Sequence, residues 1–357
     1  MHHATHQVSD ESISEMLKAA AVVPTNQDSC ISEEDYQGIF AKQGLRNAER
    51  LLQALADSNW DADPDQCCIV SVGGADGSEL EHLLRKGVAT KAVLVEMSGL
   101  GCGLARTRLE RLAAEQPGIT WLVAQGDVTE QLDCVEQFLV GLRDRGCKSI
   151  ILSFQAVLHE LPRRSPNYCR QLVLERLLYL FEHRLVYCCE PSTAKNWPKL
   201  VELRVPGVSP HQLTKVAEFL RDRLRFSAEA VLPAGRYVRM GSDLALEVLH
   251  KVLRSVDARE FVYECGEQLT SFDAGEYAGF LQRSFGLGVS VERKTSGSFA
   301  SAYRRFNVHA RCMLGETLDV PNSHSIVIAA TPRQAAITAA PAPSWSPAPM
   351  PAGKHGT

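Results

Sequence analysis

Apolar and polar positions follow two alternating periods through the first half of the chain. Short runs rich in β-branched residues are separated by longer stretches whose apolar positions recur every three or four residues. The predicted strands are residues 68–72, 89–96, 119–124, 149–154 and 184–189, and the predicted helices between them are residues 78–85, 103–115, 131–143 and 165–181. This alternation is typical of βαβ units in a parallel sheet, and right-handed crossovers bring the carboxyl ends of such strands to one edge.

Residues 1–64 precede this alternation and are predicted to form a helical lead with a disordered start. From Ser32 to Asp57 the apolar positions recur at helical spacing. Ser32 is the expected N-cap of this helix, and Gly44 is an expected break in it. The sheet itself is expected to begin in the segment 65–192.

The alternation stops after residue 192. Residues 193–270 contain four prolines and two helical patterns, residues 211–225 and 243–256. Prolines at this density interrupt regular strands and helices, so a helical insertion folded over the sheet edge is expected here.

The last part of the core is expected in residues 271–315. Residues 271–285 are a predicted helix with Ser271 as its N-cap. Residues 289–293 and 305–313 then have the composition of two strands, which predicts an antiparallel hairpin. Residues 316–357 are rich in proline and alanine, and such a composition buries too little apolar surface to fold, so a disordered tail is predicted.

Composition indicates a globular protein that has neither an overall basic surface nor a membrane span. Of the 357 residues 45% are hydrophobic, which is enough for a substantial core. The net charge of −4 gives no overall basic surface. No apolar run approaches the roughly 18 residues that a membrane span requires, and the N-terminus has no secretory signal.

The cysteines point to a reducing compartment. There are 11 of them, and no two have the CxxC spacing of a zinc or redox motif. They are expected to be small buried apolar residues. We therefore expect a cytoplasmic protein without a metal site.

A glycine turn follows the first predicted strand and opens a helix. It comprises Gly73, Gly74, Ala75, Asp76 and Gly77. A parallel strand that ends in such a turn brings bare backbone N–H groups and a helix N-terminus to an open crevice. The sequence therefore predicts a site for a nucleotide-like ligand.

Two acids at the same edge narrow the choice of ligand. Glu96 ends the second strand about 20 residues after the glycines, where an acid accepts hydrogen bonds from ribose hydroxyls. Asp127 follows the third strand, where it is expected to accept from an adenine amine while the N–H of Val128 reaches a ring nitrogen. The sheet edge thus offers groups for a tail, a ribose and a base.

With these residues in place the chain resembles the Rossmann-like (class I) S-adenosylmethionine-dependent methyltransferases. The resemblance is carried by VSVGGADGSEL, VLVEMS, AQGDV, IILSFQAVLHEL and LVYCCEPS, and later by TSFDAGEYAGFLQRSFGLGVSVE. It implies a doubly wound, mostly parallel seven-stranded sheet with an antiparallel last strand. It also implies S-adenosyl-L-methionine as cofactor, with Met97, Phe154 and Gln155 beside it in addition to the glycine turn, Glu96, Asp127 and Val128.

The turn departs from the family pattern in two places. Ala75 stands in the middle of a turn that is usually G-x-G-x-G, and Ser71 stands where the family often has an acid. A dinucleotide site fits less well, because its G-x-G-x-x-G fingerprint would fall on Gly73, Ala75 and Ser78 and only the first matches.

Methyl transfer needs an acceptor atom held in line with the methyl group, and a base when that atom carries a proton. The candidates for proton transfer are His159 and Glu160, in the helix expected after the fourth strand. Histidine accepts a proton near neutral pH. The structural alternative for both is a surface or helix-capping role.

The acceptor side is the least determined part of the sequence. Nine basic side chains face four acidic ones between Lys195 and Arg239, which suits an RNA or another anionic acceptor but also a solvated helix face. The leading hypothesis is a methyltransferase for a small-molecule acceptor in specialised metabolism. The alternatives are an RNA methyltransferase and a non-catalytic S-adenosylmethionine-binding protein, and homo-oligomers are compatible with each.

Overall fold

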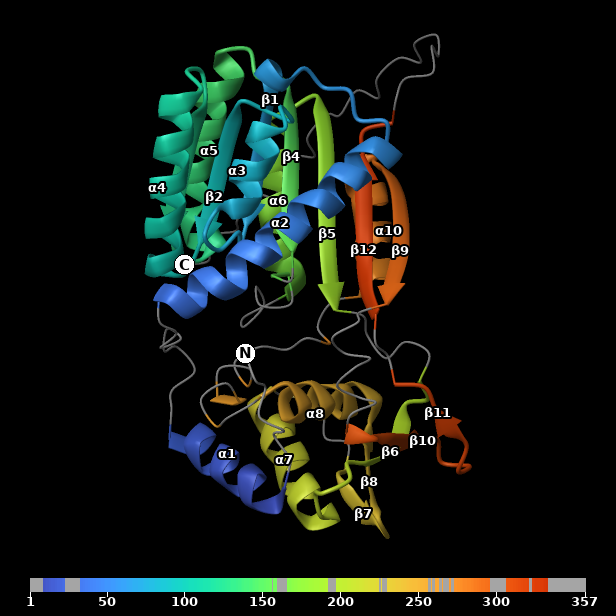
Figure 1. The fold of residues 1–357 in the computed structure, drawn as a ribbon. Coiled ribbons are helices and arrows are strands. Elements are labelled where there is room, and N and C mark those ends of the chain that lie inside the picture. Colours follow the sequence, from blue (N-terminus) through green and yellow to red (C-terminus); the bar gives the residue numbers. More distant parts are fainter. Residues whose placement is uncertain are drawn as a thin grey trace, which may run out of the picture.

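The structure is a computed structural model. It describes residues 9–22, 33–155, 157–158, 166–191, 197–224, 226, 230–255, 258, 261–262, 265, 270, 273–295, 306–320 and 323–332. Figure 1 shows two lobes, a larger one built on a long twisted sheet and a smaller one below it. The smaller lobe is formed by separate parts of the chain, because α1 (Asp10–Val22) lies there as well as the insertion.

The larger lobe has one seven-stranded sheet in the order β3-β2-β1-β4-β5-β12-β9. Its strands are β1 (Cys67–Val72), β2 (Lys91–Glu96), β3 (Thr120–Gln125), β4 (Ser149–Gln155), β5 (His183–Pro191), β9 (Gly288–Thr295) and β12 (Ser323–Ala330). The first five pair in parallel, whereas β12 is antiparallel to both β5 and β9. This confirms the predicted doubly wound sheet with an antiparallel last strand.

Helices cover both faces of this sheet because successive side chains of its strands point to opposite sides. In β1, Cys68, Val70 and Val72 pack in one core and Cys67 and Ile69 in the other. The first core contains α5 (Val128–Asp144), α6 (Pro166–Leu178) and α10 (Ala274–Phe285), and the second contains α2 (Glu33–Asp57), α3 (Ser78–Arg85) and α4 (Gly99–Glu115). All six residues of β1 are buried, as a central strand requires.

Helix α2 is continuous through Gly44, so the predicted break there is wrong. A Cβ atom at Gly44 would lie 2.0 Å from Ser78 Oγ, the first residue of α3. The glycine therefore allows close packing between two helices rather than interrupting one. The predicted cap Ser32 lies outside the described residues.

The smaller lobe contains a sheet that the sequence patterns did not predict. It has five strands in the order β11-β10-β6-β8-β7, all paired antiparallel. They are β6 (Leu200–Arg204), β7 (Leu232–Ala234), β8 (Tyr237–Gly241), β10 (His309–Arg311) and β11 (Thr317–Leu318). The two predicted helices of the insertion are present as α7 (Pro210–Arg223) and α8 (Ser242–Arg254).

The C-terminal hairpin was placed incorrectly. The strand predicted at residues 305–313 lies in the smaller sheet, where β10 pairs with β6. The antiparallel partner of β9 is instead β12, within the segment 316–357 predicted as a disordered tail. The run SHSIVIAA in β12 is strongly apolar, but the proline and alanine content around it concealed this strand.

Helices α1 and α10 are each fixed by contacts of identified residues. Helix α1 packs its buried Ile13, Met16 and Ala20 into the core of the smaller lobe. The N-cap of α10 is Asp273, whose Oδ1 accepts from the N–H groups of Gly275 and Glu276. The prediction of Ser271 as that cap is therefore wrong.

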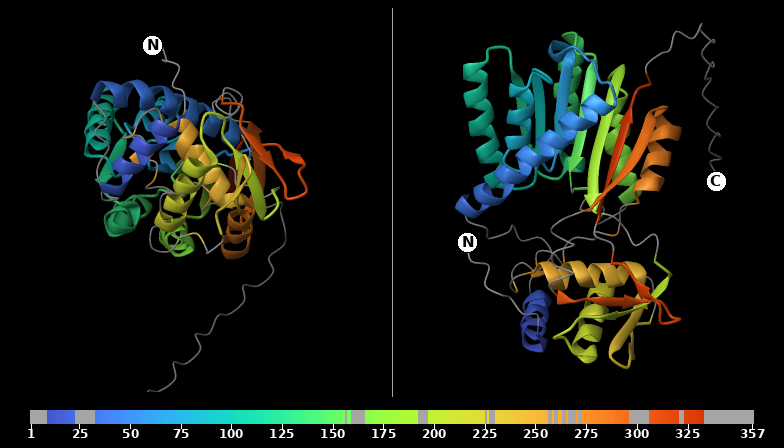
Figure 2. Two further views of the ribbon diagram at one scale, coloured as in Figure 1. Left: turned by 90° about the horizontal axis from the view of Figure 1, so that it is seen from below. Right: turned by 45° about the vertical axis from the view of Figure 1, so that its right-hand side comes forward.

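The two lobes face each other across the carboxyl edge of the large sheet. In Figure 1 the arrow of β5 points down toward the smaller lobe, and the right-hand view in Figure 2 shows the same arrangement. Helix α8 is the part of the smaller lobe nearest that edge in both views. Residues after the carboxyl ends of β1 to β5 consequently face the smaller lobe.

Candidate functional site

Three residues of the glycine turn after β1 have a left-handed backbone conformation, which glycine adopts most readily. Gly73, Ala75 and Gly77 have positive φ angles of 69°, 49° and 72°. The N–H of Gly73 donates to Val95 O at 2.8 Å, which ties the turn to β2. A Cβ atom at Gly74 would lie 2.4 Å from Leu94 Cδ1, so the turn lies directly on the end of β2. Ala75 occupies the left-handed region at a cost that glycine would avoid.

Glu96, the last residue of β2, joins the turn to the start of α4. Its Oε2 accepts from the N–H of Ala75 and its Oε1 from the N–H of Ser98, both at 2.9 Å. Burial raises the pKa of Glu96, and the backbone N–H bonds act in the opposite direction. The carboxylate predicted to bind a ribose therefore lies at the turn and is fixed in orientation. The next residue, Met97, is 64% exposed at the same edge.

Asp127 is the N-cap of α5. Its Oδ1 accepts from the N–H of Thr129 at 2.7 Å and from Thr129 Oγ1 at 2.5 Å. In the described part of the chain Oδ2 has no hydrogen-bond partner, so a donor such as an exocyclic amine could reach it. Val128 is the first residue of α5, and its side chain is buried. The positive end of the α5 dipole lies beside this carboxylate.

Two residues predicted to bind the cofactor, Asp76 and Phe154, have side chains that contact other parts of the protein. Asp76 is 1% exposed, accepts from the N–H of Ser78 through Oδ1, and forms an ion pair with Arg108 at 2.8 Å. Phe154 is 1% exposed and packs in the core with α5 and α6. The side chains of both are therefore occupied within the protein.

Gln155 belongs to a buried polar network that sequence reasoning missed. Its Nε2 donates to Glu79 Oε1 at 2.8 Å and to Ser153 Oγ at 3.2 Å. Ser153 Oγ and Ser71 Oγ also donate to the Glu79 carboxylate, at 2.8 and 3.4 Å. Burial raises the pKa of Glu79, and these three hydrogen bonds lower it. The sequence signal was an acid, Glu79, on the apolar face that α3 turns to the sheet.

The predicted proton-transfer residues, His159 and Glu160, lie outside the described residues. The backbone just before them is held by two buried charged side chains. Glu190 Oε1 accepts from the N–H groups of Val157 and Leu158, both at 2.9 Å. Arg170 donates to Leu158 O through Nη2 at 2.7 Å and Nε at 3.2 Å. Glu190 is the penultimate residue of β5, so this peptide is fixed at the carboxyl edge.

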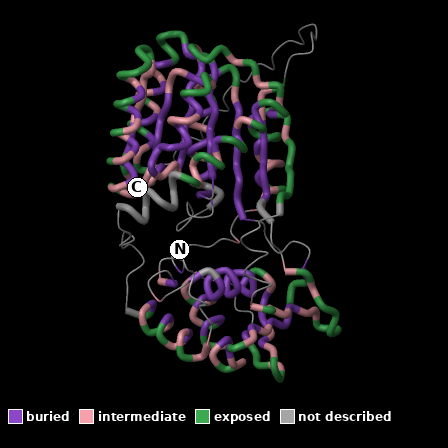
Figure 3. Tube along the Cα trace, viewed as in Figure 1, coloured by how far each residue is buried: buried purple, intermediate pink, exposed green. Residues whose placement is uncertain are grey.

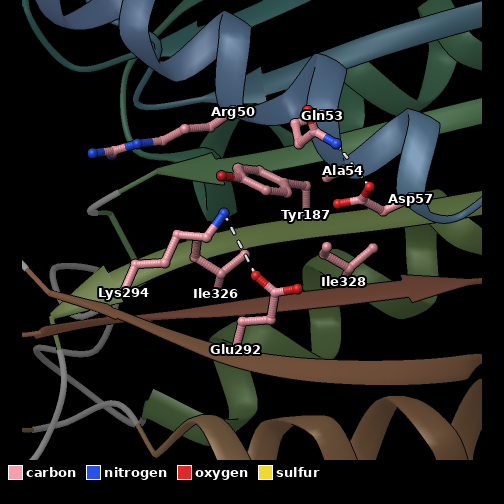
Figure 4. Close-up of a pocket in the computed structure, with 9 residues that line it drawn as sticks. All are labelled: Arg50, Gln53, Ala54, Asp57, Tyr187, Glu292, Lys294, Ile326 and Ile328. Carbon is pink, nitrogen blue, oxygen red and sulfur yellow. Dashed lines mark hydrogen bonds and ion pairs between the residues drawn. The ribbon is translucent and has the colours of Figure 1, made fainter.

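A small cavity lies away from this edge. Figure 4 shows it beneath α2, lined by Arg50, Gln53, Ala54, Asp57, Tyr187, Glu292, Lys294, Ile326 and Ile328. Its volume of about 10 Å³ is close to the space that one water molecule needs. None of the predicted site residues lines it. It is therefore a packing defect of the sheet face and not the ligand site.

The described residues contain no group of three or more His, Cys, Asp or Glu side chains that could hold a metal ion. Within the same residues no helix is both long enough and apolar enough to cross a membrane.

The hydrogen-bond acceptors at this edge are suited to S-adenosylmethionine. Gln155 Oε1 is buried and has no hydrogen-bond partner in the described part of the chain. Buried acceptors are rarely left unpaired in folded proteins, so this atom needs a donor. With Glu96 on one side of the turn and Gln155 on the other, the residues present fit a cofactor that has a ribose and an ammonium group.

No protein-family model and no curated protein matches the sequence. Among solved structures, the plantazolicin methyltransferase BpumL in complex with SAH (S-adenosylhomocysteine) is 9% identical with a TM-score of 0.40, over 90% of this chain and 96% of that chain. The O-methyltransferase from Bacillus cereus in complex with SAH is 11% identical with a TM-score of 0.35, over 91% and 92%. The methyltransferase domain of bacterial CtHen1-C is 13% identical with a TM-score of 0.36, over 80% and 98%.

The strand order is the more direct observation. It runs outward from β1 to β3 on one side and through β4 and β5 on the other, and β12 enters antiparallel between β5 and β9. That is the arrangement which the sequence motifs implied. The chain has a Rossmann-like, doubly wound sheet into which β12 enters antiparallel.

Proposed function

We propose that this protein binds S-adenosylmethionine at the carboxyl edge of its large sheet and transfers the methyl group to a small-molecule acceptor. One observation carries the proposal. The glycine turn, Glu96 and Asp127 lie at the carboxyl ends of three strands that are neighbours in the order β3-β2-β1. Glu96 is hydrogen-bonded to the turn itself. The groups proposed to bind the tail, the ribose and the base therefore lie in a row along one edge.

Each part of the cofactor has a candidate partner. Glu96 is the proposed acceptor for the ribose hydroxyls, because a carboxylate has further lone pairs beyond the two that bind Ala75 and Ser98. Oδ2 of Asp127 and the N–H of Val128 are the proposed partners of the adenine edge. When bound, S-adenosylmethionine supplies a methyl group on a sulfonium, which a nucleophile can displace.

The acceptor is proposed to lie between this edge and helix α8. Residues 244–253 of α8 are all buried, and Figure 3 shows this helix as buried along most of its length. The buried residues include an ion pair between Glu247 and Lys251, both 0% exposed. We propose that this ion pair forms the polar side of an enclosed acceptor site, which would suit a small acceptor better than an open groove. His159 and Glu160 remain the proposed proton acceptors.

Isothermal titration with S-adenosylhomocysteine tests the cofactor assignment. The wild type should bind, and Glu96→Ala should weaken binding by on the order of tenfold or more, because it removes a charged acceptor. Glu110→Ala is the matched control, since Glu110 is an exposed acid on α4. Absence of binding by the wild type, or equal binding by the Glu96 variant, would contradict the proposal.

A second candidate function, methyl transfer to RNA, is favoured by the outer face of the smaller sheet. The face opposite the core carries Arg204, Tyr237, Arg239, His309 and Arg311 around Glu202. Glu202 accepts from Arg239 Nη2 at 2.8 Å and from Arg311 Nε at 2.7 Å, and Arg311 Cζ lies 3.9 Å from the centre of the Tyr237 ring. Guanidinium and aromatic planes on an open sheet are suited to single-stranded RNA.

Salt-dependent RNA binding distinguishes this second candidate. Fluorescence anisotropy with a labelled single-stranded RNA should show binding that weakens in Arg204→Ala/Arg311→Ala and falls steeply with salt. Arg221→Ala/Arg223→Ala on α7 removes the same charge from another surface and is the control. No binding by the wild type, or equal loss in both double variants, would leave the small-molecule acceptor as the proposal.

A further inference from the structure

Glu79, in the first turn of α3, is a buried carboxylate. Glu79 is 3% exposed, and its carboxylate oxygens accept hydrogen bonds from Ser71, Ser153 and Gln155. Within the described residues no basic side chain forms an ion pair with it. A buried carboxylate without a counter-ion is costly, so its retention calls for a reason.

One consequence of Glu79 is the orientation of the Gln155 amide. An ionised carboxylate only accepts hydrogen bonds, so the amide must present its NH2 group to Glu79 Oε1, at 2.8 Å. Ser153 Oγ gives its proton to Glu79 and accepts from the same NH2 group at 3.2 Å. The amide oxygen of Gln155 is thereby directed away from Glu79. This oxygen is the buried acceptor without a partner.

The position of Gln155 places this acceptor at the glycine turn. In the pairing of β1 with β4, Val72 lies opposite Phe154, so the next residues along, Gly73 and Gln155, are level with each other. Glu96 lies on the other side of the turn, at the end of β2. The Gln155 oxygen and the Glu96 carboxylate therefore lie on opposite sides of the turn.

The network also compensates for a departure from the family pattern. Ser71 stands where the resembled family often has an acid, and Glu79 Oε2 lies 3.4 Å from Ser71 Oγ. A carboxylate is thus present at the end of β1, although it comes from α3. Its negative charge, one hydrogen bond behind the Gln155 amide, polarises that amide and makes its oxygen a better acceptor for a cation.

We infer that Gln155 Oε1 accepts a hydrogen bond from the ammonium group of the cofactor's methionine part, and that Glu79 is the positioning residue that turns the Gln155 amide to do so. The inference rests on the proposed cofactor site and assigns two side chains within it. A buried acceptor backed by a carboxylate suits a cationic donor, whereas the ribose and the base are assigned to Glu96 and Asp127 on the other side of the turn.

The test compares S-adenosylhomocysteine with its desamino analogue, in which hydrogen replaces the ammonium group. Calorimetric titration of the wild type should show the analogue binding weaker by on the order of tenfold. Gln155→Met, which keeps the volume and removes the acceptor, should bind both ligands about equally. Glu79→Gln should also reduce the discrimination, because its amide can donate to Gln155 Oε1 and turn that side chain round.

Glu81→Gln is the matched control. Glu81 lies two residues further along α3 and pairs with Arg85, Arg108 and Arg111, so this variant should discriminate like the wild type. If Gln155→Met has the stability of the wild type and still binds S-adenosylhomocysteine more tightly than the desamino analogue, the role of Gln155 is overturned. Unchanged discrimination in Glu79→Gln would overturn the positioning role. If the wild type bound neither ligand, the proposed function itself would fail.

Discussion

Glu96 and Ala75, 21 residues apart in sequence, are joined by a 2.9 Å hydrogen bond from the Ala75 N–H to the Glu96 carboxylate. The bond fixes the glycine turn to the end of β2. It also sets the orientation of the acid proposed to bind a ribose, so one contact links the stability of the turn to ligand binding.

The first prediction is that Glu96→Gln reduces both the stability of the protein and its affinity for the cofactor product. An amide of the same shape has one acceptor for two N–H donors, so either Ala75 or Ser98 loses its partner. We expect the free energy of unfolding to fall by about 1–2 kcal/mol, in urea titrations of the ligand-free protein. Affinity for S-adenosylhomocysteine should fall in parallel. Glu110→Gln, on the exposed side of α4, should change neither, and unaltered stability of the Glu96 variant would contradict the prediction.

The second prediction concerns Gly77, the residue before α3. It has a φ of 72°, and an added Cβ would lie 2.9 Å from Ala105 Cβ on α4. Gly77→Ala should therefore destabilise the protein by roughly 2–3 kcal/mol, since strain at positive φ and crowding between helices add.

Gly87→Ala separates the two causes. Gly87 has a φ of 70° and nothing within 4 Å of an added Cβ, so only the backbone term applies. The free energy of unfolding of Gly87→Ala, measured by thermal or chemical denaturation, should be about 1–2 kcal/mol lower than that of the wild type. Equal losses at the two glycines would show that α4 adapts and that the close approach of Gly77 to Ala105 has no energetic consequence.

The parallel half of the sheet could be predicted because each of its strands is a continuous apolar run between helices. The predicted helix 78–85 coincides with α3. The smaller sheet could not be found in this way. In β6 the apolar Val201 and Leu203 alternate with Glu202 and Arg204, and the strand is only five residues long. Its partner β10 lies about 100 residues away, at His309–Arg311, so nothing local specifies the pairing.

The sequence could propose site residues where a residue type and its place after a strand indicate a role. Glu96 ends β2 and Asp127 follows β3, and acids at such positions are candidate ligand partners. Glu79 was not among the predicted site residues, because its role depends on Ser153 and Gln155, which are 74 and 76 residues away. Contacts of that kind follow from the sheet register, which the sequence alone does not supply.

The third prediction is a pH dependence of stability through Glu79. Burial raises its pKa above the ordinary value of 4.5 in the folded protein, so the folded state binds the proton more tightly than the unfolded state. This contribution to stability is present below the ordinary pKa and is lost as the pH rises through the raised value. The stability of Glu79→Gln relative to the wild type should therefore increase from pH ~5 toward higher pH.

Urea titrations of both proteins across that range measure the difference. Glu96 has a raised pKa as well, but it is present in both proteins, so its effect cancels. A constant difference between wild type and Glu79→Gln at every pH would mean that the Glu79 carboxyl has the same pKa in the folded and unfolded states. Glu81→Gln should show no such slope above pH ~5, because the arginine neighbours of Glu81 lower its pKa below 4.5 and its contribution changes only at more acidic pH.

The fourth prediction concerns Tyr187, in the middle of β5 beneath α2. Its side chain is fully buried, and in the described part of the chain its hydroxyl has no hydrogen-bond partner. Burial raises the pKa of this hydroxyl far above its usual range. Removing an unpaired buried hydroxyl relieves a desolvation cost, so Tyr187→Phe should leave stability unchanged or raise it by about 1 kcal/mol.

The cavity beside Tyr187, of about 10 Å³, is at the lower limit for one water molecule. A clear loss of stability in Tyr187→Phe would therefore show that a water fills this cavity and bonds the hydroxyl. Affinity for S-adenosylhomocysteine should not change in either case, because none of the proposed cofactor residues lines the cavity.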